Sequence, residues 1–76
     1  MRPLSSIKKG EKCRIESFND AQLGQKMMEM GFLPGEVVKV EQFAPFGNPI
    51  AISLEPSLIG IRSEEAQTVM VTLLDE

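Results

Sequence analysis

The sequence contains no histidine and only one cysteine, Cys13. Histidine is the side chain that most often serves as an acid or base at neutral pH, and it is the commonest transition-metal ligand. Without it, no serine or cysteine of this chain can be activated by a histidine base. A single cysteine excludes an internal disulfide and every Cys-x-x-Cys zinc or redox motif. We therefore predict that the protein is not an enzyme and has no catalytic, cofactor-binding or metal-binding residues.

The chain also lacks long apolar runs. No stretch approaches the roughly 20 apolar residues of a membrane-spanning helix, and the basic start is not followed by the apolar region of a signal peptide. These features predict a soluble cytoplasmic protein with no direct membrane insertion. With 76 residues, the chain is expected to form a single domain over residues 1–76. Its core is expected between about residues 7 and 73, and a deep catalytic cleft would consume most of it.

Positive charge is scarce outside the N-terminal region, and the net charge is −3. Five of the eight Lys and Arg residues precede residue 15, and the rest of the chain is acidic. Nucleic-acid binders of this size normally carry a basic excess on one face. The basic cluster could contact phosphate or acidic lipid, but a solvated edge is the simpler interpretation. We predict no nucleic-acid partner.

A helix is predicted over residues 21–30. Asn19 and Asp20 are good N-caps, because their side-chain oxygens can accept an unpaired N–H of the first turn. Three apolar residues follow at helical spacing and form one stripe, namely Leu23, Met27 and Met30. Met28 falls outside this stripe. Gly24 lies inside the helix, where glycine costs about 1 kcal/mol relative to alanine. The sequence gives no reason for it beyond a close backbone approach or neutral drift.

Residues 29–36 are predicted to end this helix, turn a corner and begin a sheet. Gly31 lies where the left-handed residue that ends many helices is expected. Pro34 cannot resume the helix, because it lacks an N–H and its ring clashes with the preceding turn. Gly35 permits a second bend before a β-rich run. Phe32 and Leu33, held between the two glycines, are expected either to enter the core or to face a partner.

Alternating apolar residues predict short strands at 13–18, 37–43, 50–55, 58–62 and 69–73, with an extended piece at 7–10 and a loosely ordered start at 1–6. Gly47 and Asn48 are expected to tolerate positive φ in the loop at 44–49. Ser63 is expected to cap a helical turn in which Glu64 and Glu65 are solvated. The predicted fold is mainly β with one short α-helix plus a helical turn. It is expected to be a small, strongly bent β-barrel, closed so that no sheet edge is exposed.

Apolar residues in the connections form the candidate binding site. Phe32, Leu33 and Phe46 lie in Gly/Pro-rich segments, where side chains can be partly exposed, and grouped exposed apolar residues mark partner sites. The alternative is that they plug the ends of the barrel. Met28 is included because methionine suits adaptable binding surfaces. The methionines of the helix are also soft ligands that suit Cu(I), but packing is the simpler interpretation.

Three segments resemble motifs of the FeoA family, small cytoplasmic accessory proteins of bacterial ferrous iron transport. They are Gln-Lys-Met-Met-Glu-Met-Gly-Phe-Leu-Pro-Gly at 25–35, Ala-Pro-Phe-Gly-Asn-Pro-Ile at 44–50 and Ile-Gly-Ile-Arg-Ser-Glu-Glu-Ala at 59–66. Their order and spacing agree over about residues 7–73. Asn48 stands where the family often has aspartate, and Ser57 and Leu58 stand where many relatives have Gly-Tyr. These departures leave the expected fold unchanged but could alter a partner surface.

The resemblance implies an SH3-like barrel with an inserted helix. It also implies a protein-interaction module that regulates or assembles FeoB, the membrane ferrous iron transporter, through the cytoplasmic part that contains its GTPase domain. Arg62 or Arg14 could then supply a cation to GTP hydrolysis. The predicted partner-binding residues are Met28, Phe32, Leu33, Phe46 and Arg62.

Two other functions remain open at this point. One is an SH3-like interaction module of an iron-dependent repressor system, which would bind a peptide or another domain. The other is a small nucleic-acid-binding barrel, which the acidic balance and the scarcity of aromatic residues disfavour. Assembly into a homo-oligomer is also open, because small barrels often pair through apolar corners.

Overall fold

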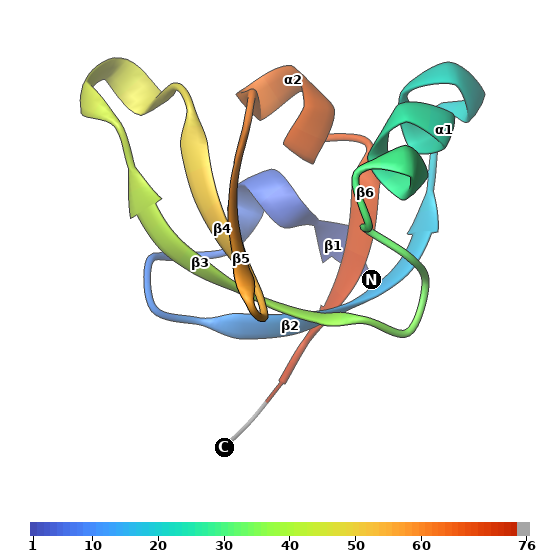
Figure 1. The fold of residues 1–76 in the computed structure, drawn as a ribbon, viewed down its shortest axis with the longest axis horizontal. Helices are drawn as coiled ribbons and strands as arrows, with labels where there is room; N and C mark the ends of the chain where they lie inside the picture. Colours follow the sequence, from blue (N-terminus) through green and yellow to red (C-terminus); the bar gives the residue numbers. More distant parts are fainter. Residues whose placement is uncertain (75–76) are drawn as a thin grey trace.

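A six-stranded antiparallel sheet forms most of this computed structural model, which describes residues 1–74 (Figure 1). The strands are β1 (Arg2–Pro3), β2 (Lys12–Phe18), β3 (Val37–Phe43), β4 (Ile50–Leu54), β5 (Ser57–Ile61) and β6 (Val69–Leu73). The other elements are α1 (Ala21–Glu29), α2 (Ser63–Ala66) and the 3-10 helices η1 (Leu4–Ser6) and η2 (Pro45–Gly47). The prediction of a mainly β fold with one short α-helix plus a helical turn is confirmed.

The strands follow the order β1-β6-β2-β3-β4-β5, and every neighbouring pair is antiparallel. The register shifts between Ile15 and Ser17 on β2 and between Val40 and Gln42 on β3. Such irregularities bend a strand and increase its twist, and the sheet curls around a single core (Figure 1). The strongly bent barrel is therefore present. The strand order begins with β1 and ends with β5, so these two are edge strands. The expectation that the barrel leaves no exposed sheet edge is therefore wrong.

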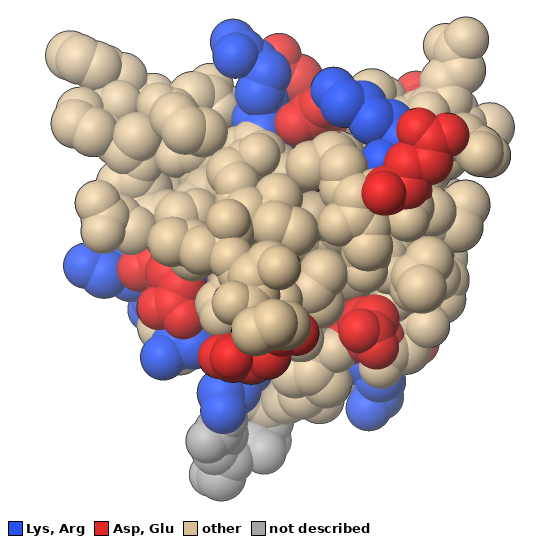
Figure 2. All heavy atoms as spheres, in the orientation of Figure 1, with Lys and Arg blue, Asp and Glu red and all other residues tan. Residues whose placement is uncertain are grey.

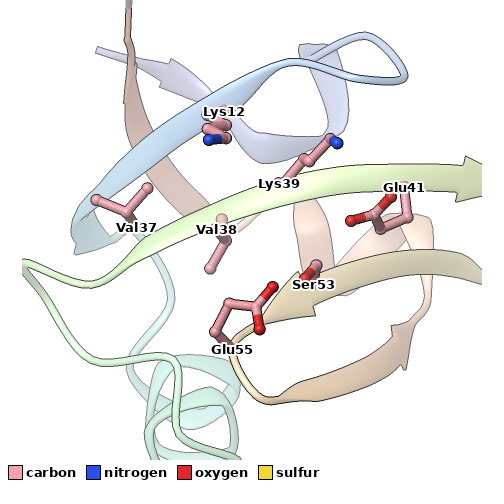
Figure 3. Close-up of a pocket in the computed structure, with 7 residues that line it drawn as sticks. All are labelled: Lys12, Val37, Val38, Lys39, Glu41, Ser53 and Glu55. Carbon is pink, nitrogen blue, oxygen red and sulfur yellow. The ribbon is translucent and has the colours of Figure 1, made fainter.

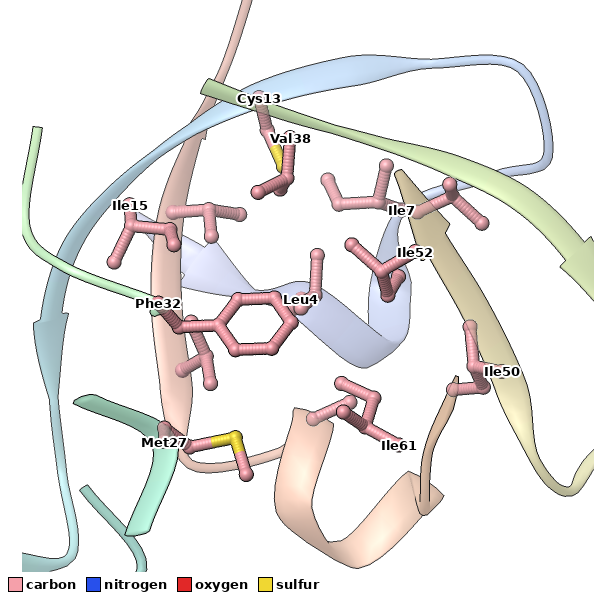
Figure 4. Packing of buried hydrophobic residues seen from close by; sticks show 14 residues of the cluster. Leu4, Ile7, Cys13, Ile15, Met27, Phe32, Val38, Ile50, Ile52 and Ile61 are labelled. Carbon is pink, nitrogen blue, oxygen red and sulfur yellow. The ribbon is translucent and has the colours of Figure 1, made fainter. Parts of the chain in front are cut away.

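The hydrophobic core lies inside the curl and draws on β2 to β6, both α-helices and the N-terminal segment. Its buried members are Leu4, Ile7, Cys13, Ile15, Met27, Phe32, Val38, Val40, Ile50, Ile52, Ile61, Ala66, Val69 and Val71. Figure 4 shows the ring of Phe32 in the middle of this cluster, between Ile15, Leu4 and Met27. Phe32 is the largest of the fully buried side chains. The corner after α1 therefore supplies the central residue of the core.

The first six residues are ordered, contrary to the expected loose start. Arg2 and Pro3 pair with Val71 and Met70 of β6, and Leu4 is only 2% exposed. A two-residue strand and a three-residue 3-10 helix are too short to display a hydrophobic period. Their order comes from contacts with β6 and α2, which lie far away in the sequence. The core thus begins before the expected boundary at residue 7.

Helix α1 begins and ends as its sequence predicts. Oδ1 of Asp20 accepts a hydrogen bond from a backbone N–H of the first turn (2.9 Å). At the other end Gly31 has φ = +98°, and its N–H donates to the carbonyl of Met28 (3.0 Å). The N–H of Phe32 donates to the carbonyl of Met27 (3.0 Å). These two bonds form a Schellman motif, whose left-handed residue is most easily glycine.

Gly24 has a packing role that the sequence did not reveal. It is buried, and a Cβ atom at this position would lie 2.8 Å from Cβ of Phe18. Phe18 is the last residue of β2, so the contact determines how closely α1 approaches that strand. A Cβ atom is attached directly to the backbone and cannot swing away, so the missing side chain of Gly24 permits the approach.

We expect Gly24→Ala to lower the free energy of unfolding by up to about 2 kcal/mol. Overpacking costs about 1–3 kcal/mol, and the better helix propensity of alanine offsets about 1 kcal/mol of that. Urea denaturation measures the change. Gln22→Ala, at an exposed position of the same helix, is the matched control and should be nearly neutral. A Gly24→Ala protein more stable than the wild type would contradict this account of the α1–β2 contact.

Candidate partner-binding surface

The structure separates the five residues predicted to bind a partner. The exposed fraction is 105% for Phe46, 48% for Leu33 and 39% for Met28, but 0% for Phe32. Arg62 is also exposed. Because Phe32 does not reach the surface, it cannot be one of the residues that contact a partner. The alternative prediction, that it is buried inside the barrel, is confirmed for this residue. Whether the other four bind a partner stays a prediction.

The corner after α1 directs Phe32 and Leu33 in opposite directions. Its backbone is attached to β2, because the N–H of Gly35 donates to the carbonyl of Ile15 (2.7 Å) and the N–H of Ile15 donates to the carbonyl of Glu36 (2.9 Å). With this attachment and the Schellman bond before it, Phe32 enters the core and Leu33 remains half exposed. Two adjacent apolar residues in a loop show no hydrophobic periodicity, so the sequence could not predict which of them is buried.

Phe46 is presented by the β3–β4 connection in a strained backbone conformation. Its φ and ψ are 68° and 12°, in the left-handed region that bulky residues rarely adopt. The N–H of Gly47 donates to the carbonyl of Ala44 (2.8 Å), which closes a turn with Pro45 and Phe46 in its centre. Glycine or asparagine is usual at the second central position of such a turn. Residues in such conformations cost about 1–3 kcal/mol and cluster at functional sites.

The next two residues correct a second expectation. Gly47 has positive φ as expected (+86°), but Asn48 is extended, with φ = −137°. Oδ1 of Asn48 accepts a hydrogen bond from the N–H of Ser63 (2.7 Å). Helix α2 begins at Ser63, with Arg62 at the N-cap position. The expectation that Ser63 caps this helix is therefore wrong. The side chain of Asn48 satisfies this helix N-terminus from another part of the chain and fixes the loop of η2 against α2.

Glu65 is buried, so the expectation that it is solvated is wrong. The residue is 6% exposed, with Oε1 accepting from the N–H of Arg62 (2.8 Å) and Oε2 accepting from Nζ of Lys26 on α1 (2.5 Å). The backbone bond first, and then the Lys26 ammonium, hold the pKa of Glu65 below its usual range. The ionised carboxylate thus joins α2 to α1. The neighbouring Glu64 is exposed, as expected.

These contacts connect the three elements that carry most of the exposed candidates. A side-chain hydrogen bond links the loop of η2 to α2, and the ion pair between the exposed Lys26 and the buried Glu65 links α2 to α1. Figure 1 shows the three elements along the same end of the curled sheet. Phe46 lies in η2, Arg62 precedes α2, Met28 lies on α1 and Leu33 follows it. We refer to these four residues as the candidate surface.

Further exposed apolar side chains lie outside the predicted set. They are Met1, Val37, Phe43 and Leu58. Alternation along a strand could have revealed two of them, because successive side chains point to opposite faces. Leu58 precedes the inward-facing Ile59, and Val37 precedes the buried Val38. At 68%, the exposed fraction of Leu58 is notably high for a residue inside a strand.

Reactive groups are few and are already engaged. Among residues 1–74, no group of three or more His, Cys, Asp or Glu side chains could hold a metal ion. Burial raises the pKa of Cys13 to about 11, which leaves the thiol protonated and unreactive at neutral pH. Nε of Arg14 lies 3.2 Å from Oε2 of Glu16, and Nε of Arg62 lies 3.5 Å from Oε2 of Glu64. That the protein uses neither metal nor cofactor stays a prediction.

A cleft of about 330 Å³ lies over β3 and its neighbouring strands (Figure 3). Its lining residues are Lys12, Val37, Val38, Lys39, Glu41, Ser53 and Glu55. Two ammonium groups and two carboxylates line the cleft, so its charge favours neither anionic nor cationic ligands. It therefore does not by itself indicate a class of ligand.

The structure places this protein in the class of small, strongly bent β-barrels that carry exposed apolar side chains in their connections. No helix within residues 1–74 has both the length and the apolar character needed to span a membrane. The FeoA domain model matches residues 2–73, and the chain belongs to the FeoA family. The resemblance inferred from the three sequence motifs is thereby confirmed.

Solved structures of similar proteins support the assignment. A FeoA-like protein from Clostridium acetobutylicum has a TM-score of 0.90 and 28% identity, over 99% of this chain and 88% of that one. An iron uptake regulatory protein (FeoA) has a TM-score of 0.84 and 30% identity, over 96% of each chain. The Stenotrophomonas maltophilia FeoA in complex with zinc has a TM-score of 0.79 and 27% identity, over 95% and 91%. The last is described as an SH3 domain protein, which confirms the SH3-like fold.

A manganese-dependent transcriptional repressor has the same fold over part of its length. Its TM-score is 0.82 at 20% identity, over 96% of this chain and 41% of that one. At this identity the likeness concerns the fold alone, because one fold hosts many functions. Among curated proteins, no match is found.

Proposed function

We propose that this protein is an accessory protein of bacterial ferrous iron uptake that binds the cytoplasmic part of FeoB and regulates or assembles the transporter. The FeoA domain match over residues 2–73 carries the proposal. The S. maltophilia FeoA has been proposed to act as a ferrous iron transport activating factor, which supports a role of this kind. Under this proposal the protein works in the cytoplasm, is not an enzyme and binds no nucleic acid.

The candidate surface has the properties of an interface anchor. Hot spots are enriched in aromatic and arginine side chains that enter pockets on the partner, and Phe46 and Arg62 are of these types. Phe46 exposes its whole ring on a turn that is restrained by Pro45 before it and by the hydrogen bond of Asn48 after it. A preordered anchor loses less conformational entropy on binding than a mobile one. We infer that the strain at Phe46 is retained because the ring contacts the partner.

A narrower role in GTP hydrolysis would require Arg62 or Arg14 to reach the nucleotide. Each guanidinium is paired with a glutamate two positions further on. Such exposed pairs contribute only about 0–1 kcal/mol, so a partner could displace them. No contact orients one arginine rather than the other, and the proposal therefore concerns binding.

The proposal predicts that the purified protein binds the cytoplasmic part of its cognate FeoB, and that Leu33→Glu and Phe46→Asn each weaken binding by roughly tenfold or more. Glutamate places a charge in an apolar contact. Asparagine tolerates the left-handed conformation, so Phe46→Asn removes the ring without disturbing the turn. Isothermal titration calorimetry, with and without guanine nucleotide, measures the affinities.

Lys9→Glu provides the control, because Lys9 is exposed and lies in a turn outside the candidate surface. This variant should bind FeoB as the wild type does. An absence of wild-type binding in every nucleotide state would contradict the proposed function. Normal binding by both surface variants would leave the function standing and would place the interface elsewhere on the protein.

A further inference from the structure

Strand β5 forms an open edge of the sheet with none of the usual protection. It is the last strand in the order, with β4 as its neighbour, and the residues 57–61 carry no charge and no proline. Among residues 1–74, no backbone hydrogen bond of β5 outside the β4 pairing is present. Proteins usually protect such edges with lysine, proline or a bulge, because unpaired N–H and C=O groups invite another strand.

The pairing with β4 determines which backbone groups of β5 point outward. The two strands are joined by a two-residue turn, so Leu54 and Ser57 form the first hydrogen-bonded pair. In an antiparallel pair, alternate residues direct their N–H and C=O groups toward the neighbouring strand. Ser57 and Ile59 therefore bond to β4, while Leu58 and Gly60 direct theirs to the open edge. Both of these residues are exposed.

The exposed edge is complementary to itself. When a second β5 runs antiparallel to the first with Ile59 opposite Ile59, Leu58 of each copy lies opposite Gly60 of the other. Their outward N–H and C=O groups then form hydrogen-bonded pairs in both directions. On the outer face, the largely exposed Leu58 side chain meets a residue that has no side chain, beside Pro49, whose Cβ lies 3.7 Å from where a Cβ of Gly60 would be. A twofold interface requires this kind of self-complementarity.

The charged residues on either side of β5 also favour antiparallel pairing with Ile59 opposite Ile59. Glu55 lies in the turn before the strand and Arg62 follows it, so antiparallel copies bring the carboxylate of one near the guanidinium of the other at both ends. Figure 2 shows an uncharged area in the middle of this face, where β5 lies in Figure 1, with charged side chains above and below it. The pair of Arg62 with Glu64 is 3.5 Å long and exposed, and such pairs contribute only about 0–1 kcal/mol, so the guanidinium can exchange Glu64 for Glu55 of the second copy.

We propose that the protein forms a twofold homodimer in which two β5 strands pair antiparallel across Ile59 and extend the sheet from one copy into the other. The occupant of the edge is a second copy of this chain. The pairing covers a short strand, so the dimer forms reversibly as concentration rises. The proposal does not rest on FeoB binding, although Arg62 belongs to both surfaces.

Sedimentation velocity of the full chain over a wide concentration range tests the dimer. We expect the wild type to pass from monomer to dimer, and Leu58→Lys to lower the association constant roughly tenfold or more, because it places two charges in the interface. Leu33→Lys, with the same change of charge away from β5, should dimerise like the wild type. A wild type that stays monomeric throughout, or a dimer unaffected by Leu58→Lys, would overturn the proposal.

Charge reversal tests the register and does not depend on how well Leu58→Lys folds. Glu55→Arg and Arg62→Glu should each weaken the dimer several-fold, because each change acts at both ends of the interface. The double variant, which restores opposite charges across the interface, should recover most of the wild-type association. Circular dichroism verifies that each variant is folded. Failure of the double variant to recover would rule out the antiparallel pairing across Ile59.

Discussion

Replacing Phe32 by alanine is expected to remove a large part of the stability of the domain. The ring is completely buried and is the largest side chain in the core. A buried Phe→Ala substitution costs about 3–5 kcal/mol, whereas a domain of this size has a total stability of roughly 4–11 kcal/mol. Urea denaturation followed by circular dichroism should show an early transition or a chain that is already largely unfolded without denaturant.

The adjacent residue supplies the control for this experiment. Leu33 is 48% exposed, so Leu33→Ala should change the free energy of unfolding by about 0.5 kcal/mol or less. The same loop therefore contains one residue required for folding and one that is available to a partner. Comparable losses from the two substitutions would show that the corner after α1 does not separate them in the way the structure describes.

Replacing Glu65 by alanine is expected to lower the free energy of unfolding by about 1–3 kcal/mol, mainly because the N–H of Arg62 is left without its acceptor. The substitution removes the acceptor of the Arg62 N–H and the partner of Lys26, and it leaves a gap beneath α2. Glu64→Ala, at the exposed neighbouring position, should be nearly neutral. Equal effects of the two substitutions in urea denaturation would argue against a structural role for the buried carboxylate.

Ionisation of the Glu65 carboxylate should make the free energy of unfolding depend on pH, with a sign that follows from its lowered pKa. The pKa of Glu65 is lowered in the folded protein, relative to about 4.3 in an unfolded chain. The resulting stabilisation is complete above the unfolded pKa and is lost as pH falls through the lower, folded pKa. The stability difference between the wild type and Glu65→Gln should therefore be constant from about pH 6 to pH 8 and shrink below about pH 4. A difference that grows toward acid pH would contradict this assignment.

Glu65 also connects the stability of the fold to the candidate surface. Its two hydrogen bonds join α1 to the start of α2, and Asn48 joins α2 to the loop that carries Phe46. A substitution at Glu65 thus releases the elements that hold Met28 and Arg62. For this reason, binding variants are better chosen among exposed side chains, such as Leu33 and Phe46, than among these buried contacts.

The sequence by itself determined the elements and the way they end. Asp20 caps α1, Gly31 ends it with the predicted left-handed residue, and alternating apolar residues mark β2 to β6. Each of these features depends on residues at most four positions apart, and such neighbours are set by the local backbone. The three family motifs belong to the same level, since they consist of contiguous residues. The family model confirms their assignment.

Only the tertiary structure decided which side chains are buried and what they contact. It placed Phe32 inside and Leu33 outside, buried Glu65 against Lys26, and brought Gly24 against Phe18. These outcomes depend on which distant segment lies opposite each residue, and a local pattern contains no information about that segment. The open edge of β5 follows for the same reason, because a strand is unpaired only in relation to the order of the whole sheet.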